Sequence, residues 1–410
     1  MYNKENLSFE DTEIAFKHST DFDLKRAYWL FKVININFMV KIGPPITNLA
    51  MKLGLPIKGI IKATIFKHFC GGETILECDN TIKRLNEGGV GTILDYSVEG
   101  EDDEKVFDNT RNEIIKTIKR AQNDPSIPLT VFKPTGVCRF ALLEKLDACL
   151  ALNNQEQEEW ERAKGRVLAI CQNAYDANVP VMIDAEESWI QNTIDLLALS
   201  MMERFNKHKA VVYNTYQLYR HDKFQSLKND FQIAQEKDFI LAAKLVRGAY
   251  MEKERARAIE KGYNSPIQSS KIDTDKDYDQ AVEFCISNIN KIAFVAGTHN
   301  EISCKKMVEI LDNLKIDQNH QHVYFSQLLG MSDNLSFNLA NAKYNVVKYV
   351  PYGPIKAVLP YLFRRAEENT AIAGQMGREL GLLTKEINRR KRQPKKLTSI
   401  NKFLNVPSTK

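Results

Sequence analysis

"VPVMIDAEE", residues 179–187, contains the pattern that decides the fold. A short apolar, β-rich run ends in Asp184, and a helical pattern then fills residues 188–208. A strand with almost no polar alternation is typical of a sheet covered on both faces. A strand followed directly by a helix is the unit from which parallel sheets are built. The stretch therefore predicts one βα unit of a parallel α/β fold.

The same unit recurs along most of the chain. The apolar runs lie at residues 91–99, 129–136, 179–187, 210–219, 240–250, 292–300, 322–330 and 345–353. Helical patterns fill the gaps, among them residues 102–122, 154–177, 188–208, 301–314 and 332–343. Eight such units favour a closed (β/α)8 TIM-type barrel. An open dinucleotide-binding sheet is the alternative, but no G-x-G-x-x-G motif follows the first run.

Polar residues stand at the end of each predicted strand, where the chemistry of such barrels is found. In chain order they are Asp95 and Glu99, Lys133, Asp184, Gln217, Lys244 and Arg247, His299, Gln327, and Tyr349. Placing so many polar groups in one barrel mouth costs free energy unless they pair or bind a ligand. The surplus of cations among them predicts an anionic ligand, such as a diphosphate or a carboxylate.

A polar stripe lies beyond the eighth run, in "YLFRRAEENT" (residues 361–370). Tyr361, Arg364, Arg365 and Glu368 follow helical spacing and share one face. Arginine is the residue whose planar fork binds a carboxylate through two parallel hydrogen bonds. The stripe is either a solvated helix face or a carboxylate clamp, and helical spacing alone leaves both readings open.

The chain has 410 residues, of which 43% are hydrophobic and 27% charged, as in ordinary globular proteins. Its basicity is concentrated at the end, because residues 385–410 hold nine Lys/Arg and one Glu. We expect an N-terminal helical arm (residues 1–75), the barrel (residues 76–385) and a basic tail (residues 386–410). The tail is either solvated or in peripheral contact with an anionic membrane surface such as the inner membrane.

Seven scattered cysteines without a CxxC pair predict a reducing compartment, with no disulfide framework and no metal site. The acidic N-terminus lacks an apolar signal core, so we expect a cytoplasmic protein. We expect no nucleic-acid partner.

Several motifs, in order, match one known family. "KLVRGAYMEKERA" (244–256) and "YLFRRAEEN" (361–369) are accompanied by "DYSVE" (95–99), "VFKPTG" (131–136), "IDAEE" (183–187), "TYQ" (215–217) and "GTHN" (297–300). From about residue 80 to residue 385 the chain resembles the proline dehydrogenase family. The resemblance implies a distorted (β/α)8 barrel that holds FAD noncovalently across its mouth, with the last helix above the barrel.

The resemblance also implies the substrate site. Arg364 and Arg365 would bind the carboxylate of L-proline, with Lys133 as a third positive contact, and Glu99 would pair with Arg364. The residues implied at this site are Asp95, Glu99, Lys133, Tyr250, Leu329, Tyr349, Tyr361, Arg364, Arg365 and Glu368.

The residues implied at the FAD site are Asp184, Ala185, Gln217, Lys244, Leu245, Val246, Arg247, Ser269, Ser270, Thr298, His299 and Asn300. Many family members carry Arg at the position of Lys244 and Lys at that of Arg247, so which of the two touches the flavin stays open. Two catalytic residues are implied. Asp184 either accepts the proton of the ring amine or is a structural anion, and Lys244 would stabilise negative charge on the reduced flavin.

The function implied is FAD-dependent oxidation of L-proline to 1-pyrroline-5-carboxylate, the first step of proline catabolism, with electrons passed to a quinone-type acceptor. Hydroxyproline dehydrogenation on the same barrel is one alternative. A flavin-free binding or regulatory protein is the alternative from a different class.

Overall fold

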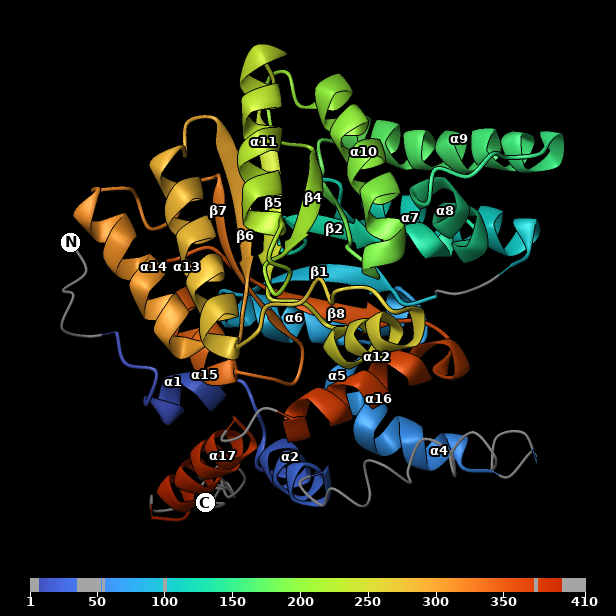
Figure 1. Cartoon of the computed structure of the whole chain (residues 1–410). Helices are drawn as coiled ribbons and strands as arrows, with labels where there is room; N and C mark the ends of the chain where they lie inside the picture. The colour runs from blue at the N-terminus through green and yellow to red at the C-terminus, as the bar shows by residue number, and fades with distance from the viewer. Residues whose placement is uncertain (1–6, 35–52, 54–55, 99–101, 372–374, 393–410) are drawn as a thin grey trace, which may run out of the picture.

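The computed structural model describes residues 7–34, 53, 56–98, 102–371 and 375–392, with the side chains of 366–371 and 375–376 left aside. Its strands are β1 (Gly91–Tyr96), β2 (Leu129–Phe132), β3 (Val181–Ile183), β4 (Val212–Gln217), β5 (Leu241–Val246), β6 (Ile292–Gly297), β7 (Val323–Leu328) and β8 (Val346–Tyr352). They pair in chain order, all in parallel, and β8 closes the barrel against β1 (Figure 1). The predicted (β/α)8 barrel is confirmed, and the open sheet is excluded.

Helices cover the outside of the barrel (Figure 1). They are α7 (Glu104–Ala121), α9 (Asn154–Ala177), α10 (Ser188–Phe205), α11 (Lys223–Glu236), α13 (Lys271–Ser287), α14 (Glu301–Asn313) and α15 (Asp333–Asn341). Two further helices, α8 (Phe140–Asp147) and α12 (Met251–Lys261), lengthen the connections after β2 and β5. Local sequence fixes some starts: α9 begins at Asn153, whose side chain forms a capping box with Glu156.

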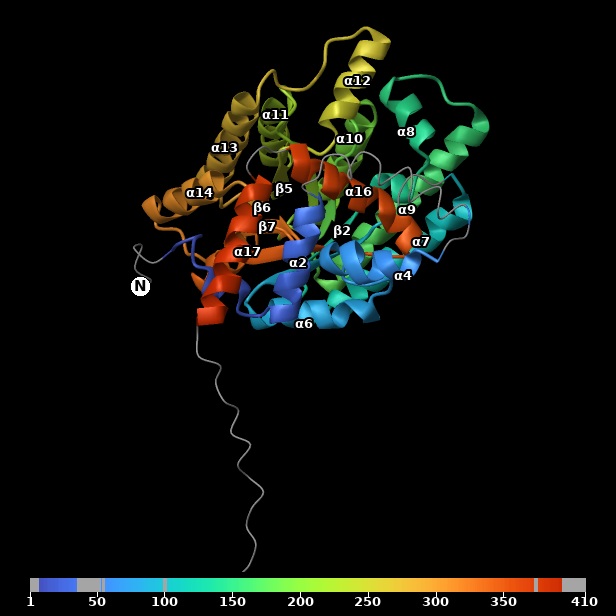
Figure 2. The ribbon, with the colours of Figure 1, turned by 90° about the horizontal axis from the view of Figure 1, so that it is seen from below.

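Helix α16 (Ile355–Ala371) lies across the end of the barrel, above its mouth, as Figure 2 shows. The chain leaves β8 through Gly353, whose φ of +145° is strained for any residue with a side chain. The wall beside β1 is covered instead by α6 (Asp79–Glu87). The placement expected from the resemblance for the helix that follows the eighth strand is therefore confirmed.

The N-terminal arm packs against the helices that follow β8. It comprises α1 (Thr12–Phe16), α2 (Asp21–Ile34), α4 (Lys58–Ile61), a π-helical turn (Lys62–Phe66) and α5 (Lys67–Phe69), and a 3-10 turn (Leu76–Cys78) follows it. Phe31 and Phe66 of the arm share a second apolar core with Val358 and Leu362 of α16 and Leu382 of α17 (Gln375–Arg392). The arm thereby holds the helix above the mouth in position.

The boundary expected between residues 385 and 386 falls inside α17. Arg389 and Arg390 both pair with the buried Glu386, and Arg390 also pairs with Asp21 of α2 at 2.8 Å. These two arginines of the predicted basic tail therefore fasten α17 to the arm.

Buried Glu379 gives the first testable prediction. It accepts a hydrogen bond from the Ser332 amide at 2.7 Å, and burial raises its pKa to about 7. Since an unfolded Glu ionises near pH 4.3, folding loses stability as pH rises towards 7, and the loss stays constant above that. Glu379→Gln should therefore stabilise the protein by about 3 kcal/mol at pH 8 and by little at pH 4.5. Thermal unfolding at both pH values checks this; the exposed Glu309→Gln is the control, and equal stability at pH 8 would contradict it.

Candidate active site

Five side chains, from five of the strands, meet in the barrel mouth. Asp184 follows β3 and is only 8% exposed. Its carboxylate accepts hydrogen bonds from the Tyr349 hydroxyl of β8 at 2.8 and 2.9 Å and forms an ion pair with Lys244 of β5. Lys133, after β2, lies 3.6 Å from the same carboxylate and 3.5 Å from Asp95 of β1. Residues far apart in sequence thus form one buried ion cluster.

The charges of this cluster are fixed by its contacts. Burial alone would raise the pKa of Asp184, but the Lys244 and Lys133 ammonium groups hold it below its ordinary value. Burial, together with the Asp184 charge, raises the pKa of Tyr349 well above its ordinary value. At neutral pH the cluster therefore contains a carboxylate that accepts and a neutral phenol that donates.

Lys244 and Arg247 make contacts with different parts of the structure. These contacts indicate which of the two residues is available to touch a flavin. Besides the Asp184 contact, Lys244 Nζ lies 3.1 Å from the Tyr349 hydroxyl, inside the mouth. Arg247 instead donates to Asp275 at 2.6 Å, to Thr298 at 2.8 Å and to Ser303 at 2.9 Å. Because these contacts use both terminal nitrogens and Nε of Arg247, Lys244 is the better placed of the two for a ligand in the mouth.

The residues after β6 are held by neighbouring loops. His299 Nδ1 lies 2.9 Å from the Ser332 hydroxyl, and burial lowers the pKa of His299 to about 3, so the ring is neutral. Thr298 accepts from Arg247, and Asn300 caps α14 by accepting from the amides of residues 302 and 303. The motif at residues 297–300 therefore combines one neutral ring in the mouth with two residues in structural contacts.

Gln217, at the end of β4, is buried to 2% exposure, and its Oε1 has no hydrogen-bond partner in the described chain. An unpaired buried amide oxygen costs free energy, so it marks a place where a ligand donor is missing. Ala185, Leu245 and Val246 line the neighbouring strand ends. Ser269 and Ser270 directly precede α13, and both hydroxyls donate to Asp273.

Helix α16 brings Tyr361 and Arg365 to the mouth. Both are 7% exposed, and the Arg365 guanidinium lies over the Tyr361 ring at 5.2 Å. Arg365 contributes to the low pKa of His299, and Tyr361 to the high pKa of Tyr349, so both are close to the mouth residues. Arg364 is half-buried on the same helix.

Of the other predicted substrate residues, the structure describes Leu329 and Tyr250. Leu329 is buried, and its amide donates to the Tyr349 carbonyl at 2.9 Å. Tyr250 is half-buried and caps α12. Glu99 and the side chain of Glu368 lie outside the described residues.

Two supporting residues, Ser332 and Lys348, were not predicted from the sequence. Ser332, with a left-handed φ of +51°, presents its hydroxyl to His299. Lys348 is fully buried, with its ammonium 2.8 Å from Asp333 and within reach of two backbone carbonyls. Lys348 could have been noticed in the sequence, because it is a lysine within an otherwise apolar strand. No sequence feature marks Ser332.

Comparisons with known proteins identify the family of this chain. The family model described as proline dehydrogenase matches residues 78–378. "Proline dehydrogenase 1, mitochondrial" of Dictyostelium discoideum is 33% identical over 434 residues, which cover 95% of this chain and 76% of that protein. The carbapenem antibiotics biosynthesis protein CarD of Pectobacterium carotovorum is 34% identical, over 78% of this chain and 83% of that protein.

Among solved structures, proline utilization A from Bdellovibrio bacteriovorus superposes with a TM-score of 0.71 at 19% identity. The match covers 90% of this chain but 40% of that one, and at this identity it supports the fold alone. The family model and the Dictyostelium relative both span most of the barrel that carries the ion cluster. The chain therefore belongs to the proline dehydrogenase family and is an oxidoreductase.

Proposed function

We propose that this enzyme oxidises L-proline to 1-pyrroline-5-carboxylate with noncovalently bound FAD and passes the electrons to a quinone-type acceptor. The observation that carries the proposal is the buried cluster of Lys133, Asp184, Lys244 and Tyr349 beneath α16, which presents Arg365 and Tyr361 to the same mouth. Cations beside the aromatic side chains of Tyr349 and Tyr361 suit a small amino acid that has an apolar ring and a carboxylate.

Arg365, with Arg364, would bind the proline carboxylate, and Tyr361 and Tyr349 would flank the ring. The Tyr349 hydroxyl is fixed by Asp184 and Lys244, so it cannot turn aside to admit a ring hydroxyl. This contact, together with a family model and a relative that are both described as proline dehydrogenases, favours proline over hydroxyproline. The flavin-free binding protein is excluded as a class by membership in an enzyme family.

The mouth offers suitable groups for FAD. Gln217 has an unpaired buried oxygen, Lys244 supplies a positive charge, and neutral His299 offers its second ring nitrogen. When bound, FAD supplies the acceptor for the hydride from the ring carbon beside nitrogen. The chain's own contribution is to hold the ring in position and to keep the mouth closed under α16.

Of the two roles considered for Asp184, the contacts favour the structural anion. Its oxygens already accept from Tyr349 and Lys244, and its lowered pKa makes it a weak base at neutral pH. We therefore assign it the task of fixing Lys244 and Tyr349, and we expect the amine proton to leave by another route.

A Gln217→Leu variant tests the cofactor site. Loss of the amide that pairs with the flavin should weaken FAD binding about tenfold, since one hydrogen bond to a buried group is removed. Flavin released on dilution, measured by fluorescence, checks this against the exposed Gln225→Leu control on α11. Equal retention in both variants would remove Gln217 from the site.

Peripheral membrane contact through the basic tail stays part of the proposal. None of the helices in the described part of the chain combines the length and the apolar character that a membrane span requires. Because Arg389 and Arg390 are tied to the arm, a deletion should begin at residue 393 to leave α17 intact. Binding to anionic liposomes should then fall, with the largest difference at low salt; unchanged binding would end this part of the proposal.

Anaerobic addition of L-proline to the purified, flavin-loaded protein tests the function directly. We expect the absorbance of oxidised flavin to bleach with proline and much less with hydroxyproline. Bound flavin that does not bleach with proline would overturn the proposed substrate.

A further inference from the structure

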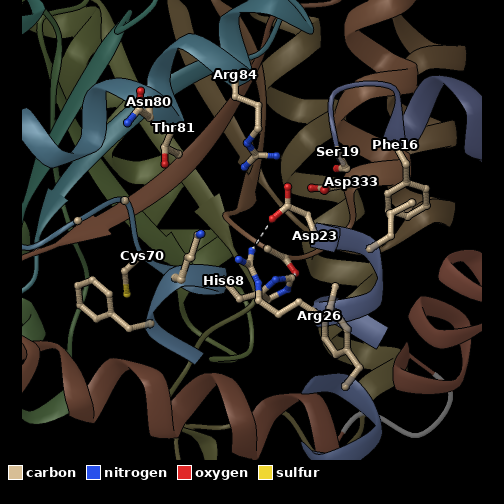
Figure 3. Close-up of a pocket in the computed structure, with 18 of the residues that line it drawn as sticks. Phe16, Ser19, Asp23, Arg26, His68, Cys70, Asn80, Thr81, Arg84 and Asp333 are labelled. Atoms are coloured by element: carbon tan, nitrogen blue, oxygen red, sulfur yellow. Dashed lines mark hydrogen bonds and ion pairs between the residues drawn. The ribbon is translucent and has the colours of Figure 1, made fainter. Parts of the chain in front are cut away.

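A second cavity, of about 420 Å³, lies between the N-terminal arm, α6 and the loop after β7. Figure 3 shows Arg26, His68 and Arg84 pointing into it from α2, α5 and α6. No described residue that we place at the substrate or flavin site lines this cavity. Its size is in the range of pockets that bind small organic ligands.

Two arginines in this cavity have donors left over. Arg26 uses one terminal nitrogen on Asp23 at 3.1 Å, but its Nε and its other terminal nitrogen are buried without a partner in the described chain. Arg84 forms no hydrogen bond or ion pair with any described residue. Burial lowers the pKa of Arg26, and the nearby Arg84 charge lowers it further against the opposing effect of Asp23. The two guanidinium groups, which line the same cavity, thus repel each other.

The carboxylates that line the cavity offset this charge only in part. Asp23 opposes the Arg26 charge, and the Arg84 charge helps to hold the pKa values of Asp23 and Asp333 below their ordinary values. Asp333 pairs with Lys348 at 2.8 Å, and Glu77 pairs with Lys62 at 3.3 Å. Glu379 accepts from the Ser332 amide, and Asp23 is held by Arg26. Unused guanidinium donors beside committed carboxylates are the pattern expected where an external anion binds.

Part of the remaining lining is apolar, and the other part is polar, with Lys62, Lys67, Asn80 and Thr81. Phe16, Leu24, Phe31 and Phe66 are all buried and face the same space. The part of the lining formed by His68 and Gly330 is tightly packed. His68 Nε2 lies 2.9 Å from the Gly330 carbonyl, and a Cβ atom added at Gly330 would lie 2.5 Å from the backbone oxygen of His68. A preformed cavity with apolar side chains and a cationic end favours ligands that have both an apolar body and an anionic group.

We propose that this cavity is a second binding site, which takes a small organic anion with a carboxylate at Arg26 and Arg84 and an apolar body against the phenylalanines. The proposal goes beyond the oxidation of proline and does not depend on it, because none of its residues belongs to the barrel mouth.

Octanoate is a suitable probe, and calorimetric titration of the full chain measures its binding. Arg84→Gln should weaken octanoate binding at least about tenfold, the effect of losing a charge-assisted contact. Lys83→Gln, an exposed neighbour on the same helix, should change it less than about twofold. Octanol, which has the same chain without the charge, should bind at least about tenfold more weakly than octanoate.

Two controls check that the Arg84→Gln variant is folded and that octanoate binds in the second cavity. Because Arg84 pairs with no described residue, Arg84→Gln should unfold at the same temperature as wild type or higher when no probe is present. Arg365→Met should bind octanoate as wild type does, whereas loss of binding in that variant would place the probe at the substrate clamp. That result, or equal binding by Arg84→Gln and wild type, would overturn the proposal, whatever the outcome of the flavin-bleaching test.

Discussion

An Asp184→Asn variant should lose about 10³-fold in kcat/KM for proline, the effect of removing one preorganised charge from the proposed active site. Asp184 is the carboxylate that contacts both Lys244 and Tyr349, so its neutralisation releases both from their positions. Steady-state kinetics with a flavin-loaded sample measures the loss. Asp238→Asn, which breaks an exposed ion pair with Lys291, is the control and should change neither rate nor stability appreciably.

The same substitution should cost about 3 kcal/mol of folding stability, since it leaves the buried Lys244 charge without its counter-ion. Asp184→Asn combined with Lys244→Met should recover much of that stability, because the uncompensated charge is then gone. Activity should stay low in the double variant, since both members of the cluster are missing. Recovery of activity together with stability would show that the cluster only supports the fold.

The pH dependence separates the anion role of Asp184 from a base role. Its folded-state pKa lies below the ordinary value, so its stabilising charge is present above about pH 4 and is lost as pH falls through the folded pKa. The activity deficit of Asp184→Asn should therefore be constant from about pH 6 to 9. A deficit that grows with rising pH across this range would instead indicate a base that titrates there.

The barrel could be predicted from sequence because its signals are local. Each strand is a short apolar run, and helix starts such as Asn153 carry their own caps. The ion cluster was also largely predictable, because the carboxyl ends of parallel strands converge: the sequence placed Lys133, Asp184, Lys244 and Tyr349 at strand ends before any contact was known. The position of α16 above the mouth came from the resemblance, since its amphipathic pattern would equally suit the barrel wall.

What the sequence did not predict depends on contacts between distant segments. Ser332 joins Glu379 of α17 to His299 of the mouth, and Arg390 joins the C-terminal helix to Asp21. No periodicity encodes such pairs. The same holds for the second cavity, because Arg26 lies on α2 of the arm and Arg84 on α6 of the barrel wall. The two arginines meet only after the arm has folded onto the barrel.

An Arg365→Met variant should raise the KM for proline about 100-fold while FAD stays bound, because a buried carboxylate loses charge-assisted hydrogen bonds from the substrate clamp. Arg365 is the more buried of the two arginines proposed to bind the carboxylate and lies over Tyr361, so we expect a smaller increase for Arg364→Met. Initial rates over a wide range of proline concentration, together with flavin content from absorbance, check both. Lys356→Met, an exposed position on the same helix, is the matched control.

A substrate without a carboxylate shows whether the loss belongs to that group. Pyrrolidine has the same ring, so wild type should prefer proline to pyrrolidine strongly in kcat/KM, and Arg365→Met should lose most of that preference. Arg365→Lys, which keeps the charge but not the planar fork, should fall between the two. If Arg365→Met lowered the rates with proline and pyrrolidine by the same factor, the arginine would act on the position of α16 or on the flavin, and the carboxylate clamp would have to be assigned to Arg364 and Lys133.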